Sequence, residues 1–223
     1  MVFQIFDDSI EFPDPRCGEP DGLFAIGGDL SPERLLMAYG MGIFPWFSFR
    51  DSPEPMWYCP MQRFVIFPEE LHISHSTRNL INRKLYHMTF NEAFDRVIEG
   101  CAEKRCEQEG AWLGKDMIEA YKRLHTLGFA ASVEVWRGEE LVGGLYGVTM
   151  AGVFFGESMF SREPGVSKLA LVYLCELMKT GGGRMIDCQF ETPHLKSMGG
   201  RFISYEDYLG ILRRPYWLPA QGH

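Results

Sequence analysis

The sequence predicts an α+β fold in which a small N-terminal α+β domain, residues 1–65, precedes a larger C-terminal domain, residues 66–223. Segments whose apolar residues recur at helical spacing alternate with segments whose apolar residues recur at every second position, and three segments of the second kind stand next to one another. The 223 residues are 46% hydrophobic and 23% charged, which is typical of a folded chain and excludes a disordered or collagen-like one.

The N-terminal third opens with a segment typical of a loop. Residues 12–29 are dense in Pro, Gly and Asp, which favour turns over regular elements. Ser31-Pro32-Glu33 then supplies a capping hydroxyl, a proline at the first helical position and an acid in the first turn, so a short helix is expected up to Gly40. In the run Gly42–Phe47, Pro45 separates four large apolar side chains that no regular element would hold on one face. We expect this run to form either a core plug or the wall of a ligand site.

The middle of the chain alternates between strand and helix patterns. Tyr86–Phe90 is strand-like, and Asn91 is a natural cap for a helix with inward-facing Phe94, Val97, Ile98 and Cys101. A second amphipathic helix is expected from about Asp116 to Leu127, and Gly128 ends it.

Three strands, a helix and a last strand follow. The period changes to two, which predicts a hairpin and a third strand at residues 132–136, 141–148 and 153–159. A helix is expected from about Ser167 to Lys179, and Arg184–Gln189 is expected to be the last strand. This order lets the last strand pair beside the third and leaves the sheet splayed around the intervening helix.

Composition excludes several classes of protein. The longest uncharged stretch, Leu141–Gly156, has sixteen residues with five glycines, short of the ~20 apolar residues of a membrane span. The N-terminus carries acids where an export signal needs Lys or Arg, so we expect a cytoplasmic monomer that binds no membrane. The six cysteines form no CxxC motif, and His72 and His75 have no second Cys or His pair nearby, so neither a disulfide scaffold nor a metal site is expected.

Charge is distributed unevenly. The net charge of −8 argues against a protein that coats nucleic acid nonspecifically. Residues 1–77 carry 4 basic and 12 acidic side chains, whereas the remainder carries 18 of each. Within residues 71–91 there is no acid, but there are Arg78, Arg83 and Lys84. This segment is either a local anion-binding face or an ordinary solvated face.

A short motif precedes the helix expected at Ser167. The loop from Arg162 through Gly165 to Ser167 resembles the pyrophosphate loop of GNAT-type acyltransferases, in which free N–H groups at a helix N-terminus bind an anion, with Ser in the last position of the motif. The order of helix, three antiparallel strands, helix and strand is similar to the same acyltransferase core. The resemblance implies a GNAT-like fold for the C-terminal domain.

Four longer strings carry a more specific resemblance. They are GGDLSPERLLMAYGMGIFPWF (27–47), ELVGGLYGV (140–148), FFGESMFSR (154–162) and IDCQ (186–189). In this order, and over roughly residues 10–217, the chain resembles the leucyl/phenylalanyl-tRNA–protein transferase family of bacteria. The resemblance implies transfer of Leu or Phe, and we expect also Met, from aminoacyl-tRNA to the N-terminal amine of a protein that begins with Arg or Lys, which marks that protein for degradation. Because the ester is already activated, we expect no cofactor and no metal.

Three positions depart from the family pattern. Leu174 and Met178 stand where relatives carry aromatic residues that line the amino-acid pocket, and Thr192 stands where Asn is expected. Because Met adapts its shape easily, these changes bear on the choice among amino acids and not on the reaction centre.

Asp187 and Gln189 are the expected catalytic residues. Being two apart on a strand, they would project from the same face. Aminolysis of an ester needs an uncharged amine, a group that takes its proton, and donors that face the developing oxyanion. The resemblance places the pair at the reaction centre, with Gln189 orienting the amine and Asp187 polarising it or attracting the cationic acceptor. The alternative is a strand end that is hydrogen-bonded to a neighbouring loop.

Glu157 lies between apolar residues of the third expected strand, so its carboxylate needs a partner. An N-terminal Arg or Lys of the acceptor is one candidate. The other is an internal ion pair with Arg162, Lys168 or Arg184.

The remaining site residues are expected to bind the aminoacyl-tRNA. Trp46 and Trp112 either stack on the terminal adenine or pack between domains. The cations Arg78, Arg83 and Lys84 would hold the backbone of the acceptor stem. By position, six apolar residues match the family's pocket for an uncharged amino-acid side chain: Leu145, Phe154, Leu171, Leu174, Met178 and Ile186. Each of them could equally be an ordinary core residue.

Two other functions compete with this one. The first is an N-acyltransferase that uses acyl-CoA, which is compatible with the loop Arg162–Ser167. The second is a non-catalytic module that binds RNA or a peptide. Saturable binding of CoA without any effect of RNA would favour the first. Specific RNA binding without loss of the esterified amino acid would favour the second.

Overall fold

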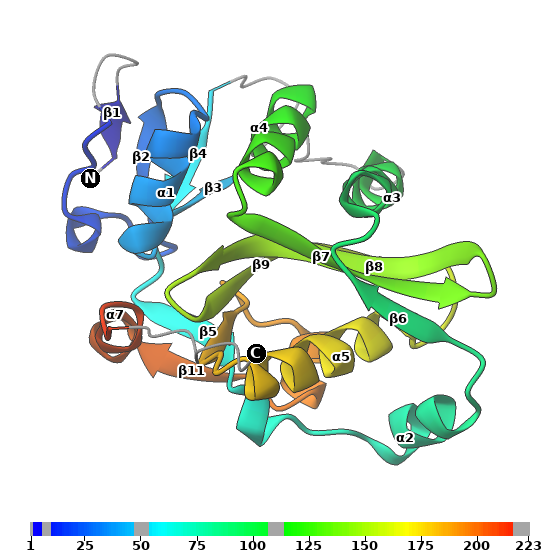
Figure 1. The fold of residues 1–223 in the computed structure, drawn as a ribbon. Helices are drawn as coiled ribbons and strands as arrows, with labels where there is room; N and C mark the ends of the chain where they lie inside the picture. The colour runs from blue at the N-terminus through cyan, green and yellow to red at the C-terminus, as the bar shows by residue number, and fades with distance from the viewer. Residues whose placement is uncertain (1, 6–9, 47–53, 107–113, 216–223) are drawn as a thin grey trace.

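The structure, a computed structural model, describes residues 2–5, 10–46, 54–106 and 114–215 (Figure 1). Two mixed β-sheets and the helices packed on them make an α+β fold, the class that the sequence predicts. Every helix in these described ranges falls short of the length and apolarity needed to span a membrane.

The smaller sheet is built from the N-terminal part of the chain. Its strands lie in the order β1-β2-β4-β3, with bounds Phe3–Ile5 (β1), Leu23–Gly27 (β2), Met56–Tyr58 (β4) and Phe44–Trp46 (β3). The loop prediction for residues 12–29 is therefore wrong in part, because β2 lies within that segment. Three residues of the run Gly42–Phe47, Phe44–Trp46, form strand β3. Strand β3 stands at an edge of the sheet, where Pro45 removes no hydrogen bond that a neighbour needs.

Helix α1, Pro32–Gly40, begins where the sequence predicts. Pro32 is its first residue, and the Ser31 hydroxyl accepts a hydrogen bond from the backbone N–H of Arg34. The helix covers the small sheet and turns the buried side chain of Tyr39 toward the larger sheet.

The larger sheet has seven strands in the order β11-β5-β10-β9-β8-β7-β6. Their bounds are Arg201–Ser204 (β11), Gln62–Ile66 (β5), Met185–Asp187 (β10), Val153–Ser161 (β9), Glu140–Met150 (β8), Ala130–Arg137 (β7) and His87–Phe90 (β6). The predicted hairpin, the third strand and the pairing of β10 beside β9 are confirmed, and the structure shows that β10 and β9 run parallel. The predicted domain boundary between residues 65 and 66 falls within β5, and no pattern in the sequence analysis predicts β5 or β11.

Helices cover both faces of the larger sheet (Figure 1). Helices α3 (Phe94–Cys106) and α4 (Lys115–Thr126) pack on one face, and α5 (Val166–Thr180) packs on the other. The shorter helices are η1 (Pro15–Cys17), η2 (Pro68–Glu70), α2 (His75–Asn82), α6 (Pro193–Ser197) and α7 (Tyr205–Leu212).

The start of α3 differs from the prediction. Asn91 has a φ of 62°, and the helix begins only at Phe94. The backbone N–H of Ala93 donates to the buried carboxylate of Glu134, which lies on β7. A carboxylate from another element thus takes the capping role that the sequence assigns to Asn91.

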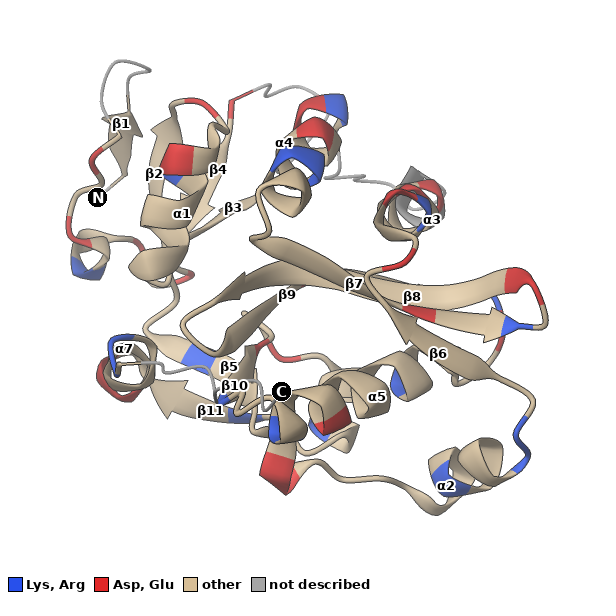
Figure 2. Ribbon diagram, in the orientation of Figure 1, with Lys and Arg blue, Asp and Glu red and all other residues tan. Residues whose placement is uncertain are grey.

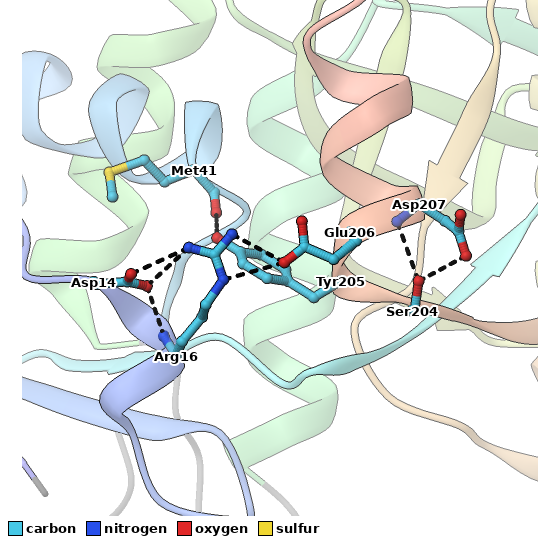
Figure 3. Close-up of polar contacts among 7 residues, drawn as sticks. All are labelled: Asp14, Arg16, Met41, Ser204, Tyr205, Glu206 and Asp207. Carbon is cyan, nitrogen blue, oxygen red and sulfur yellow. Dashed lines mark hydrogen bonds and ion pairs between the residues drawn. The ribbon is translucent and has the colours of Figure 1, made fainter.

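The C-terminal helix α7 is fastened to the N-terminal part of the chain (Figure 3). The guanidinium of Arg16 lies between the carboxylates of Asp14 and Glu206, at 3.1 and 2.9 Å. Tyr205 Oη donates to the carbonyl of Met41 at 2.8 Å. Because exposed ion pairs contribute only ~0–1 kcal/mol, the buried Tyr205 ring secures this contact more than the Arg16 pairs do.

A β-bulge interrupts the pairing of β8 with β9. Tyr146 pairs with Ser158 and Gly147 pairs with Gly156, so Glu157 is the extra residue on β9. A Cβ at Gly147 would meet the carbonyl and side chain of the neighbouring strand, so glycine is required there. The bulge turns Glu157 toward α1 and α4, which carry its hydrogen-bond partners.

Candidate active site

A cavity of about 670 Å³ opens where β10 ends and β9 continues. The two strands pair in parallel only up to Asp187 opposite Phe155, and β9 then runs on to Ser161. The cavity walls are the second half of β9, the segment Cys188–Phe190, one face of α5, and β3. Ligands commonly bind beyond the carboxyl ends of parallel strands, because the strands part there.

One wall of the cavity is apolar. It includes five of the six residues predicted for the amino-acid pocket, namely Leu145, Phe154, Leu171, Leu174 and Ile186. The structure does not bring the sixth, Met178, into this lining. Its side chain lies one turn further along α5, against Gly183.

A second wall is aromatic. The Trp46 ring lines the cavity with its centroid 5.1 Å from that of Phe190 and 5.6 Å from that of Tyr58. Phe44 packs edge-on against Phe190 at 5.7 Å. Of the described part of the run Gly42–Phe47, Phe44, Pro45 and Trp46 line the cavity, whereas Ile43 is fully buried in the core, so both alternatives hold in part. Trp112, the other predicted stacking residue, lies outside the described residues.

Asp187 and Gln189 do not share a strand face, so that part of the prediction is wrong. Strand β10 ends at Asp187, and Gln189 has a φ of 59°, which breaks the alternation. Asp187 is fully buried. Its carboxylate pairs with Arg63 Nε at 2.9 Å and accepts a hydrogen bond from Tyr208 Oη at 2.8 Å. Its Oδ1 also accepts the backbone N–H of Gln189 at 2.9 Å. Gln189 lines the cavity, and Asp187 holds the turn that puts it there.

Arg63 is a site residue that no sequence motif predicts. This fully buried residue on β5 lies between the rings of Phe44 and Tyr208, 4.8 Å from each centroid, and donates to the carbonyl of Gly42. Burial, the largest single influence, acts to lower the pKa of Arg63, but the Asp187 carboxylate together with Tyr208 and Cys59 outweighs it, so the pKa is raised and the guanidinium stays charged. An arginine directly before the apolar run Phe64–Phe67 is the signal that could have found it.

Glu157 has partners that neither sequence hypothesis names. It is 7% exposed, and its Oε1 and Oε2 lie 2.7 Å from Tyr39 Oη and Tyr121 Oη, within hydrogen-bond distance of both phenols. The internal ion pair with Arg162, Lys168 or Arg184 is not formed among the described residues. Burial raises the pKa of Glu157 to about 7, although the two tyrosine hydrogen bonds act to lower it.

The predicted basic face lies apart from the cavity. Arg78 is on α2, and Arg83 and Lys84 directly follow this helix. All three side chains are exposed. Figure 2 shows basic but no acidic residues on α2 and the turn that follows it.

The loop before α5 is partly satisfied within the chain. Gly165 has a φ of 82° at the N-terminus of α5, and Ser167 lines the cavity. The N–H of Ser167 donates to the Ser161 hydroxyl at 3.2 Å, so it is already in use. In the described part of the chain, no group of three or more His, Cys, Asp or Glu side chains is placed to hold a metal ion.

Comparison with known proteins identifies one family. The model described as leucyl/phenylalanyl-tRNA protein transferase matches residues 65–213, and the model of that family's N-terminal domain matches residues 28–61. A leucyl/phenylalanyl-tRNA–protein transferase of Shigella dysenteriae serotype 1 (strain Sd197) is 50% identical over 98% of this chain and 96% of its own. A protein of the same name from Escherichia coli (strain K12 / DH10B) is 49% identical over the same shares. The resemblance predicted from the motifs is confirmed.

Solved structures show only distant likeness. The L-PGS of Bacillus licheniformis has a TM-score of 0.44 at 13% identity, covering 73% of this chain and 53% of its own. A conserved protein of unknown function from Bacteroides thetaiotaomicron VPI-5482 has a TM-score of 0.45 at 13% identity, covering 88% of this chain and 67% of its own. Likeness this distant supports no shared activity.

Proposed function

Because the chain belongs to the leucyl/phenylalanyl-tRNA protein transferase family, we propose that it transfers leucine or phenylalanine from aminoacyl-tRNA to the N-terminal amine of a protein. The observation that carries this proposal is the cavity, where an apolar wall for the amino-acid side chain stands beside Gln189 and the aromatic wall of Trp46. The acceptors begin with Arg or Lys, and the product is marked for degradation. Met is a third donor, and the enzyme acts as a cytoplasmic monomer.

The reaction is aminolysis of an ester and needs no serine or cysteine nucleophile. Gln189 orients the incoming amine, because it lines the cavity in a fixed left-handed turn. Asp187 acts through Gln189 as a positioning residue, since its carboxylate is fully buried and already accepts hydrogen bonds from Arg63, Tyr208 and the Gln189 N–H. Orientation of this kind lowers the barrier by removing freedom that free reactants would lose in the transition state.

The acceptor and the tRNA reach the cavity from different sides. Glu157, on the cavity wall, faces the cationic group of the acceptor's first residue. Trp46 and Trp112 stack on the terminal adenosine, and the basic face of Arg78, Arg83 and Lys84 holds the acceptor stem. The exposure of that face and its lack of acids support this role.

We infer further that residues 66–223 form a GNAT-like acyltransferase domain and residues 1–65 a smaller domain. The parallel pair β9–β10, which parts to form the cavity, supports the first inference. The small sheet, whose strands all lie before residue 60, supports the second.

The test uses pure protein, labelled leucyl-tRNA and a peptide that begins with Arg and has no charged side chain after it. Label should pass to the peptide without added metal or nucleotide, and a peptide identical except for an N-terminal Asp should receive none. A Gln189→Ala variant should lower turnover more than tRNA affinity. If the label stays on the tRNA while acetyl-CoA acetylates the same peptide, the chain is an acyl-CoA enzyme instead.

A further inference from the structure

Three carboxyl groups are buried in the described part of the chain, those of Glu134, Glu157 and Asp187. Glu134 accepts hydrogen bonds from Ser132 and Thr89 hydroxyls and from two backbone N–H groups. Asp187 accepts from a guanidinium, a phenol and a backbone N–H. Each of these contacts involves a donor that brings its own proton, so both carboxyl groups are satisfied as carboxylates.

Glu157 has more short contacts than its partners have protons. Tyr39 Oη lies 2.7 Å from its Oε1, Tyr121 Oη lies 2.7 Å from its Oε2, and the two phenol oxygens lie 2.7 Å from each other. All three are ordinary O–H···O separations. Two hydroxyls supply two protons, whereas the closed triangle contains three contacts. A proton on Glu157 supplies the third.

The surroundings of the triangle also favour an uncharged Glu157. Burial is the largest influence and raises the pKa of Glu157 to about 7. The Asp187 carboxylate on β10 acts in the same direction, and Arg63 on β5 opposes it. On the β8 side, Tyr146 packs edge-on against Tyr121 at 5.5 Å and presents a neutral ring.

We propose that Glu157, Tyr39 and Tyr121 form a closed ring of three hydrogen bonds in which Glu157 is a neutral carboxylic acid, and that the ring releases one proton to solvent when a cationic acceptor group binds. The only bond broken is the O–H bond of Glu157, and the electron pair stays on the carboxylate. That carboxylate then faces the cation across the cavity wall. The release step rests on the function proposed above, whereas the neutral ring does not.

The ring gives the acceptor site a basis for selectivity. Without a cation from the acceptor, ionisation would leave a buried charge, and the Arg63 guanidinium is already paired with Asp187, so Glu157 stays neutral. An acceptor whose first residue is neutral therefore finds Glu157 uncharged. An acceptor whose first residue is cationic causes Glu157 to ionise and then binds the carboxylate.

The first test compares Glu157→Gln with Glu134→Gln by thermal unfolding between pH 5 and pH 8. A glutamine has one donor end and one acceptor end, as a neutral carboxylic acid has, so it should preserve the ring. Glu134 faces donors only, so its amide NH₂ would meet other donors, and Glu134→Gln should lower the Tm at every pH.

The sign of the pH effect follows from linkage. The folded-state pKa of Glu157 lies above its ordinary value of 4.5, so its contribution to wild-type stability is complete below that value and is lost as pH rises through about 7. The Tm of Glu157→Gln should therefore rise relative to that of the wild type between pH 5 and pH 8. If Glu157→Gln loses as much Tm as Glu134→Gln at pH 5, Glu157 is a carboxylate and the ring is disproved.

The second test follows the carboxylic-acid stretching band by infrared difference spectroscopy. Wild type at pH 6 should show a band that Glu157→Gln lacks. An amidated Arg-starting peptide without acidic residues, added with adenosine that carries leucine through a non-transferable amide, should remove the band. The same peptide starting with Ala should leave it unchanged. A Glu157 band that survives saturation with the Arg peptide would overturn the release step.

The two proposals fail separately. Loss of transfer activity in the leucyl-tRNA assay would overturn the proposed function and would leave the pH 6 band of the free protein intact. Active transfer by a wild-type protein that shows no Glu157-dependent band would overturn the ring alone.

Discussion

At the scale of single residues, the backbone of Gln189 connects conformation to chemistry. A φ of 59° costs a residue with a side chain ~1–2 kcal/mol, and the hydrogen bond from its N–H to Asp187 offsets part of that cost. The turn directs the chain out of β10 and into the cavity lining. Residues held in this way at a functional site store strain that a simpler side chain would release.

Replacing Gln189 with glycine should separate stability from activity. Gln189→Gly relieves the left-handed strain and should raise the free energy of unfolding by up to ~1 kcal/mol, while turnover falls ~100-fold because the amide is lost. Gln189→Asn, which tolerates the same φ and keeps an amide, is the matched control and should retain more turnover. Denaturant unfolding and single-turnover transfer measure both quantities. A glycine variant that is less stable, or equally active, would contradict the assignment.

Asp187 and Arg63 allow a test of positioning against proton transfer. Asp187→Asn leaves the buried Arg63 charge unpaired and should cost ~3–5 kcal/mol of unfolding free energy. Adding Arg63→Met removes that charge and should restore most of the stability. Because the amide oxygen of the Asp187→Asn side chain can still accept the Gln189 N–H, the double variant should keep turnover within ~10-fold of wild type. A stable double variant with no turnover would show that the carboxylate itself takes the proton.

At the scale of secondary structure, the bulge between β8 and β9 determines where Glu157 points. A regular pairing would give Glu157 a partner across the ladder, and the alternation after it would be reversed. The required glycine at Gly147 therefore shapes the candidate site, although it is not among the residues that line the cavity.

Gly147→Ala should disturb this element. The added Cβ meets the neighbouring strand, so we expect a loss of ~1–3 kcal/mol in unfolding free energy together with weaker preference for Arg-starting over Ala-starting peptides. Gly210→Ala in α7, where a Cβ meets nothing within 4 Å, is the control and should be neutral or slightly stabilising. Unchanged acceptor preference in Gly147→Ala would mean that the bulge does not set the direction of Glu157.

Elements with local signals could be predicted from the sequence, and elements with distant partners could not. Ser31-Pro32 and Gly128 mark helix ends through contacts within a few residues. Strand β5 is short, and its pairing with β10 and β11 depends on chain that lies far away in sequence. Strand β3 could not be predicted because it contains Pro45. A sheet accepts proline in an edge strand, and the sequence does not show that β3 is an edge strand.

The candidate site was predicted only where the family motif supplied positions. The apolar wall could be predicted from the family motif. Tyr39, Tyr121 and Arg63 could not be predicted as site residues, because in the sequence each is an ordinary residue of its own helix or strand. The resemblance places Met178 on the wall, but this turn of α5 already lies beyond the cavity lining. Asp187 and Gln189 were expected to share a face, and the early end of β10 prevents this.

At the scale of the whole molecule, an acidic protein must bind a polyanion through a restricted surface. The net charge of −8 opposes tRNA at long range, so under the proposed function we expect contact to depend on the basic face after α2 and on stacking in the cavity. With three cations at that face, the slope of log affinity against log salt should be about −3 or shallower.

Charge reversal at Arg83 and Lys84 should affect full-length leucyl-tRNA and its leucyl-adenosine end differently. The double variant should weaken full-length leucyl-tRNA binding ~10-fold or more, whereas use of leucyl-adenosine should not change, because these side chains are exposed and outside the cavity lining. Lys179→Glu, at the far end of α5, makes half of that change in net charge away from the basic face and is the control for a long-range charge effect. Filter binding and fragment transfer measure the two substrates, and equal losses with both would refute the division.

The position of β5 has a consequence for biosynthesis. Residues 62–66 leave the ribosome early, but both strands that flank β5 are among the last to be made. Until Met185 emerges, the apolar strand with Phe64, Val65 and Ile66 has neither neighbour, and two open backbone edges stay available to other nascent chains. The sheet is therefore completed only near the end of translation, and ribosome-bound chains stalled before Met185 should be cut by protease near β5 while finished chains resist.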